Sequence, residues 1–113
     1  MRNEDAVRIR HMRDAAQSAI TFMQGHSLAE LSDNLMLQFA VMKAVKILGE
    51  ASTQISAPGQ HEAPHISLSV TKGMRNRLVH AYFDLNVNIL YATVKEALPP
   101  FLVQLQTIDL QNE

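Results

Sequence analysis

LMLQFAVMKAVKILGEASTQI, residues 35–55, is the stretch that decides the fold class. Two apolar stripes at helical spacing overlap in it: Leu35, Phe39 and Met42 form the first, and Met36, Ala40, Ala44, Ile47, Ala51 and Ile55 form the second. A helix that is apolar over so wide an arc is usually covered on more than one side. We therefore expect this stretch to be the central helix of an all-α bundle.

The residues upstream of this helix predict two further helical segments. Apolar side chains recur there in steps of three and four, at Ile9, Met12, Ala16, Ile20 and Met23. Gly25 suits the end of that helix, because glycine readily takes the left-handed conformation found just beyond helix termini. Ser27 and Glu30 then form the capping-box pattern, so a new helical segment is expected to begin there.

The downstream residues predict the remaining helices. Ser67 or Ser69 can cap a helix that runs through MRNRLVHAYF, residues 74–83. Asn86 can cap a last segment, whose apolar steps are Leu90, Val94, Ala97, Phe101, Leu105 and Ile108.

Two adjacent prolines, Pro99 and Pro100, interrupt this last segment. Either the helix kinks there or a fresh helix begins at one of them, since proline disrupts a helix interior and suits a first turn. No segment shows sustained alternation with period two. We therefore expect an up-and-down bundle of four to five helices, with residues 1–113 forming one domain.

The composition is that of an ordinary soluble protein. Of the 113 residues, 47% are apolar, and the net charge near −1 gives no strong field toward nucleic acid or anionic lipid. The absence of cysteine excludes disulfides and thiolate metal sites. The N-terminal residues lack the apolar part of a signal peptide, and no run approaches the length of a membrane span. We expect a cytoplasmic protein with no membrane association.

The string HEAPH, residues 61–65, fits the H-E-x-x-H pattern of zinc hydrolases. That pattern works only when both histidines share one helix face. Pro64 disfavours α conformation at the residue before it and has no N–H to donate. We therefore expect a polar surface loop here, with no metal site.

The stretch GMRNRLVHAYFDLN, residues 73–86, holds residues better suited to chemistry. Histidine can move protons near neutral pH, and arginine stabilises charge on a phosphate. Arginine, histidine and a hydroxyl, here Arg75, His80 and Tyr82, suit phosphodiester chemistry, and RNA brings its own nucleophile, the 2′-OH, so no metal is required. The alternative is a helix whose Arg and His lie on a solvated face while Leu78, Val79 and Phe83 pack.

One geometric difficulty concerns Arg75 and His80. Five positions separate them, so on an ideal helix they diverge by about 140°. They could converge through the reach of arginine, through fraying of the helix end, or across a symmetric dimer.

RNRLVHAY resembles the Arg-x4-His-x-Tyr motif of the HEPN-domain toxins in the HepT-like family of prokaryotic toxin–antitoxin modules. Arg75, His80 and Tyr82 carry the match, with Asn76 after the arginine. Two other pieces agree: ILGEA, residues 47–51, resembles the family's I-G-E-A segment, and FDLNVNILY with LPPFL resembles the helix and Leu-Pro step after the motif. A Pro-Trp pair common before the motif helix is replaced by HISLSV, and a later position that is often Trp in the family corresponds to Tyr91.

The resemblance implies a HEPN-like helical bundle that dimerises and cleaves RNA, tRNA being one candidate, without a metal or other cofactor. Arg75 would bind the scissile phosphate and His80 would transfer protons. Asn76 would orient the phosphate or His80. The implied partner is a nucleotidyltransferase antitoxin that inhibits the toxin by AMPylation of Tyr82. Such a module is classed as type II or type VII.

A second function remains open at this point. The chain could be a non-catalytic subunit, itself the antitoxin, that binds nucleotide or docks on a nucleotidyltransferase.

The residues Arg8, Arg10, His11 and Arg13 form a basic patch that either contacts RNA phosphate or is a solvated, ion-paired face. Glu50 is either a buried structural partner or a carboxylate that supports the site.

Overall fold

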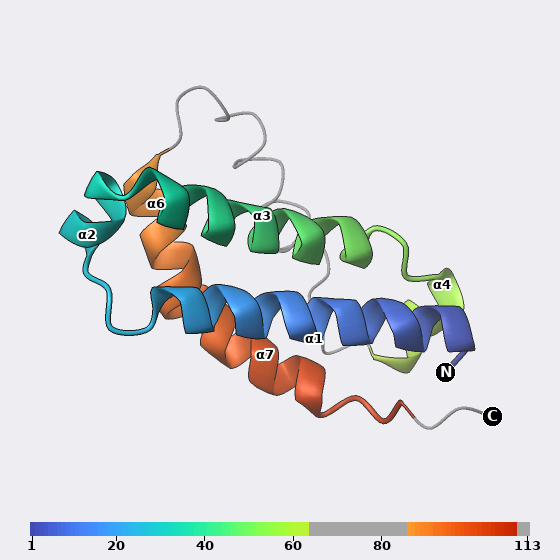
Figure 1. Cartoon of the computed structure of the whole chain (residues 1–113). Coiled ribbons are helices and arrows are strands. Elements are labelled where there is room, and N and C mark those ends of the chain that lie inside the picture. Colours follow the sequence, from blue (N-terminus) through green and yellow to red (C-terminus); the bar gives the residue numbers. More distant parts are fainter. Residues whose placement is uncertain (64–85, 111–113) are drawn as a thin grey trace.

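The computed structural model describes residues 1–63 and 86–110, and all regular structure in these two ranges is helical. The elements are α1 (Asn3–Met23), α2 (Leu28–Asp33), α3 (Leu35–Ser52), α4 (Ala57–Glu62), α6 (Val87–Ala92), the π-helical segment η1 (Thr93–Ala97) and α7 (Leu98–Gln106). Figure 1 shows α1 and α3 lying side by side, with α7 running across α1. The expected all-α fold class is confirmed.

The buried face of α3 coincides only in part with the predicted stripes. Its buried residues are Val41, Ala44, Val45, Leu48, Gly49, Ala51 and Ser52. Leu35, Met36 and Phe39, which begin the two stripes, are 61%, 79% and 50% exposed. Ala44 and Ala51 of the second stripe are buried, as predicted. Val41, Val45 and Leu48, which lie outside both stripes, complete the buried face, so this face lies to one side of the second stripe.

The helix α1 buries the predicted face. Ile9, Met12, Ala16 and Met23 are almost fully buried, and Ile20 is half-buried against the same cluster. Gly25 follows the helix end with φ of 78°, the left-handed conformation expected of a helix stop. Ser27 and Glu30 form both hydrogen bonds of the predicted capping box, so α2 begins where the sequence indicates.

The last helical stretch kinks and does not restart. The π-helical segment η1 joins α6 directly to α7, with α-helical backbone at both junctions. Pro99 and Pro100 lie in the first turn of α7. A proline removes the bond to the carbonyl four residues earlier, and its ring would clash with that carbonyl. The wider π turn spans the residues that carry those carbonyls, and the direction of the chain changes between α6 and α7 (Figure 1).

Two cationic side chains hold helix ends in place. Arg13 of α1 donates hydrogen bonds to the carbonyl oxygens of Leu105 and Ile108, at the end of α7 and just beyond it. The Lys95 ammonium donates to the carbonyl oxygen of Met23, the last residue of α1, at 3.0 Å. The Met23 and Leu105 carbonyls also accept backbone N–H groups, from His26 and Ile108, so the cationic side chains add a charged donor at each helix end.

Within the described ranges, no helix is long and apolar enough to cross a membrane.

Candidate functional site

The predicted site residues lie in the segment 64–85, outside the residues that the structure describes. Arg75, Asn76, His80 and Tyr82 therefore keep the status of predictions from sequence. The structure does describe the two elements that border this segment, α4 before it and α6 after it.

The upstream border corrects the expected loop at HEAPH. Ser56 caps a short helix, α4, by accepting a hydrogen bond from the Gly59 N–H. This helix carries His61 in its last turn and ends at Glu62, and Ala63 has φ of −131° and ψ of 59°. The helix thus ends before Pro64, because a proline disfavours α conformation at the residue before it. His61 and the residue at position 65 therefore do not share this helix. Among the described residues, no cluster of three His, Asp or Glu side chains could hold a metal ion.

A buried carboxylate that the sequence argument missed anchors α4. Asp5 of α1 is only 2% exposed. Its side chain accepts hydrogen bonds from both the N–H, at 2.8 Å, and the hydroxyl of Ser56. A Cβ on Gly59 would lie 2.6 Å from Asp5 Oδ2, so glycine is required for α4 to approach this closely. A signal was available, because Asp5 lies four residues before Ile9 and continues the buried stripe of α1.

The downstream border confirms the predicted cap. The Asn86 side chain accepts a hydrogen bond from the Ile89 N–H at 3.2 Å, and α6 begins at the next residue. Tyr91 is half-buried against the core, and the Lys95 ammonium lies 5.9 Å from the centroid of its ring. Tyr91 thus has a packing role.

The predicted basic patch divides between two environments. Arg13 turns toward α7, where its guanidinium donates hydrogen bonds to the main-chain carbonyl oxygens of Leu105 and Ile108. Arg8 and His11 instead line a small pocket of about 160 Å³ together with Glu50. Arg10 is exposed. Glu50 is half-buried and faces α1, which leaves its role in the predicted site untested.

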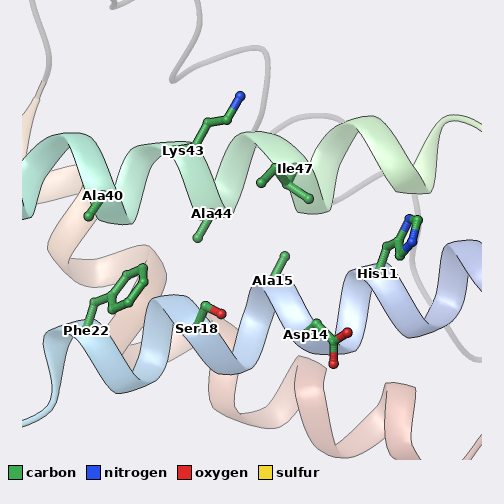
Figure 2. Close-up of a pocket in the computed structure, with 9 residues that line it drawn as sticks. All are labelled: His11, Asp14, Ala15, Ser18, Phe22, Ala40, Lys43, Ala44 and Ile47. Atoms are coloured by element: carbon green, nitrogen blue, oxygen red, sulfur yellow. The ribbon is translucent and has the colours of Figure 1, made fainter.

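A larger pocket adjoins the small one on the same side of α1 and α3. Its volume is about 470 Å³, and Figure 2 shows its lining residues on the two helices: His11, Asp14, Ala15, Ser18, Phe22, Ala40, Lys43, Ala44 and Ile47. His11 and Ile47 line both pockets, so the two are neighbours, and we call the larger one the α1/α3 groove. The groove was not predicted from the sequence.

One titratable pair stabilises the α2 terminus. His26 Nδ1 lies 3.0 Å from Glu30 Oε2, and the Ser27 N–H and hydroxyl donate to Glu30 Oε1. These bonds, that of His26 first, hold the pKa of Glu30 below its ordinary value. His26 thus supports a helix cap.

Comparison with known proteins assigns the chain to a family. The family model described as "Ribonuclease HepT-like" matches residues 12–108, a range that includes the whole RNRLVHAY motif. The chain belongs to the HepT-like ribonuclease family. The HEPN-like fold expected from the resemblance agrees with the helical structure and with this match.

Named relatives point the same way. The chain is 30% identical to "Putative RNase MJ1380" of Methanocaldococcus jannaschii over 84% of its own length and 87% of the relative's. It is 44% identical to "Probable ribonuclease HepT" of Thermococcus cleftensis over 55% of its own length and 56% of the relative's. No solved structure matches the chain significantly. The family and these names support ribonuclease activity.

Proposed function

We propose that this chain is a metal-independent endoribonuclease, the toxin of a type II or type VII toxin–antitoxin module. The observation that carries the proposal is the family match over residues 12–108, within which Arg75 and His80 stand at the motif spacing. Because the family is described as ribonucleases, its motif residues are the first candidates for the chemistry.

The proposed reaction uses groups that RNA and the motif supply. The 2′-oxygen of a ribose attacks the adjacent phosphorus, and the bond from phosphorus to the 5′-oxygen breaks. His80 takes part in the transfer of the proton that leaves the 2′-OH or the one that the 5′-oxygen gains. Arg75 donates hydrogen bonds to the phosphate oxygens, where negative charge accumulates in the transition state. Asn76 orients the phosphate or His80.

Substrate choice in this proposal depends on shape. The net charge of about −1 provides little non-specific attraction to RNA. A folded RNA such as tRNA would therefore be selected by contacts that fit its shape. Pairing of two copies would let each chain complete the other's site, which removes the angular separation of Arg75 and His80 on one helix.

Inhibition is assigned to Tyr82. A nucleotidyltransferase partner would transfer AMP from ATP to the phenolic oxygen: the oxygen bonds to the α-phosphorus and loses its proton, and pyrophosphate leaves. The adduct places a negative phosphate and a nucleoside two positions from His80, so it would repel RNA by both charge and volume.

A growth experiment tests the toxin assignment against the antitoxin alternative. We expect expression of the wild-type chain to arrest growth and His80→Ala to abolish the arrest. Co-expression of the nucleotidyltransferase partner with the wild-type chain should restore growth. His61→Ala is the matched control, because His61 is an exposed histidine on α4 that the proposal gives no role. A nucleotidyltransferase that arrests growth alone and is neutralised by this chain would contradict the proposal and favour the binding subunit.

A further inference from the structure

The small pocket lined by α1 and α3 carries two opposite charges that are not paired with each other. Arg8 of α1 and Glu50 of α3 both line it, and both are half-buried. Among the residues that the structure describes, neither side chain forms an ion pair or a hydrogen bond. A half-buried charge has lost part of its hydration, so this guanidinium and this carboxylate are available to a ligand placed between them. We call this space the Arg8/Glu50 pocket.

The remaining walls of the pocket suit a flat ring. Ile47 and Ala51 supply apolar side chains, His11 supplies an aromatic ring, and Gln54 supplies an amide. In Figure 2 the His11 ring points from α1 toward α3. The volume of about 160 Å³ is below the roughly 300 Å³ at which pockets for drug-sized ligands begin, so there is room for one small ring system.

The two charges restrict the kind of ligand that fits. A phosphate group alone would be repelled by Glu50, and a lone cation would be repelled by Arg8. A ligand that satisfies both residues must offer acceptors to the guanidinium and donors to the carboxylate. Nucleobases have edges of both kinds, and a ribonuclease meets them in its substrate.

Of the four RNA bases, guanine matches this arrangement best. Its N1–H and its N2 amino group are two adjacent donor groups, which one carboxylate can accept together. Its O6 and N7 are two adjacent acceptors, which one guanidinium can reach with its paired N–H groups. Adenine and cytosine have an amino group beside an acceptor, and uracil has one N–H between two acceptors, so none of them offers a carboxylate two donor groups.

We propose that the Arg8/Glu50 pocket binds an unstacked guanine of the RNA substrate, with Glu50 on its Watson–Crick edge and Arg8 on its O6 and N7. Proteins read single-stranded RNA by splaying out its bases and forming hydrogen bonds to their edges. The inference rests on the proposed function, and it gives the ribonuclease a base preference that its net charge of about −1 cannot provide.

Binding to RNA that cannot be cleaved tests the pocket by itself. The probes are fluorescently labelled uridine hexamers with one central guanine, hypoxanthine or adenine, and their riboses are 2′-O-methylated so that the nucleophile is blocked. Fluorescence anisotropy measures each dissociation constant. We expect wild type to bind the guanine hexamer at least about tenfold more tightly than the adenine hexamer. The hypoxanthine hexamer, which lacks the N2 amino group, should lie between them.

Three variants assign the preference to the pocket. Glu50→Gln keeps the shape of the side chain but can accept through only one oxygen, and Arg8→Lys keeps the charge but loses the paired N–H groups. Each should abolish most of the guanine preference, whatever its effect on the affinity that all hexamers share. Glu96→Gln, an exposed substitution on η1 outside the pocket lining, is the matched control and should keep the preference.

Three results would overturn the inference. The first is equal binding, or no binding, of the guanine and adenine hexamers by wild type. The second is a guanine preference that Glu50→Gln and Arg8→Lys lower no more than Glu96→Gln, while circular dichroism shows all variants folded. The third is free guanosine monophosphate that binds as tightly as the guanine hexamer, since this would assign the pocket to a nucleotide. Because the hexamers are not cleaved, failure of this inference and failure of the ribonuclease assignment are distinguishable.

Discussion

Arg13 of α1 and Leu105 of α7 are joined by two hydrogen bonds, of 3.0 and 2.7 Å, from one guanidinium to one carbonyl oxygen, although 92 positions separate them. A third bond from the same side chain reaches the Ile108 carbonyl at 2.7 Å. The long-range contact thus ties the end of the last helix to the middle of the first.

Replacement of Arg13 is expected to loosen this junction. Because Arg13→Ala leaves the carbonyls of Leu105 and Ile108 without their charged donor, the free energy of unfolding should fall by about 2 kcal/mol. Urea denaturation measures the change. Arg10→Ala, an exposed position on the same helix, serves as the control and should change stability by less than about 0.5 kcal/mol. Equal stability of the two variants would show that the contact contributes nothing.

Two glycine substitutions separate steric crowding from backbone strain. Gly59→Ala brings a Cβ to within 2.6 Å of Asp5 Oδ2, and we expect a loss of about 1–3 kcal/mol as the carboxylate or α4 shifts. Gly25→Ala meets no atom within 4 Å and is strained only by its φ of 78°, so about 1 kcal/mol is expected. Thermal unfolding of both variants gives the comparison. A Gly59→Ala protein as stable as wild type would contradict the close approach of α4 to α1.

The α2 cap predicts a pH dependence. The folded-state pKa of Glu30 is lowered, first by its hydrogen bond to His26. A carboxyl with a lowered folded pKa contributes stability that is complete above its unfolded pKa and is lost as pH falls through the folded value. We therefore expect Glu30→Gln to make the melting temperature fall less steeply with acidification below about pH 4.5, the ordinary value of this group. Glu96→Gln, also exposed, is the control, and identical slopes for both variants would refute the assignment.

A tyrosine variant tests how inhibition works. Tyr82→Phe removes the phenolic oxygen that would receive AMP but keeps the ring. We expect this variant to cleave RNA at a rate near that of wild type and to gain no mass on incubation with the nucleotidyltransferase and ATP. It should remain active in the presence of that partner. AMP addition to Tyr82→Phe, detected by intact mass, would place the modification elsewhere.

Features decided by neighbouring residues were predictable from the sequence. The stop at Gly25, the capping box of Ser27 and Glu30, and the Asn86 cap depend on local backbone chemistry, and the structure confirms each of them. The buried stripe of α1 was also predicted, because its polar side leaves one apolar face.

Features decided by the packing of distant segments were not predictable in the same way. The helix α3 is apolar over such a wide arc that its neighbours decide which line is buried, and that line includes Val41 and Leu48, outside both predicted stripes. The short helix α4 depends on the buried Asp5, 51 positions from Ser56. The roles of Arg75 and His80 stay predictions, carried by the motif and by the family to which the chain belongs.

The most direct measurement is RNA cleavage by the purified chain in excess EDTA, after intact mass has confirmed that Tyr82 is unmodified. Wild type, Arg75→Ala, His80→Ala and the control His61→Ala are incubated with total cellular RNA. We predict cleavage by wild type and His61→Ala, with a loss of at least about a hundredfold in the other two, the usual contribution of a general acid–base or charge-stabilising group. Equal behaviour of all four proteins would contradict the assignment of the chemistry to Arg75 and His80, and cleavage that EDTA abolishes would contradict the metal-independent mechanism.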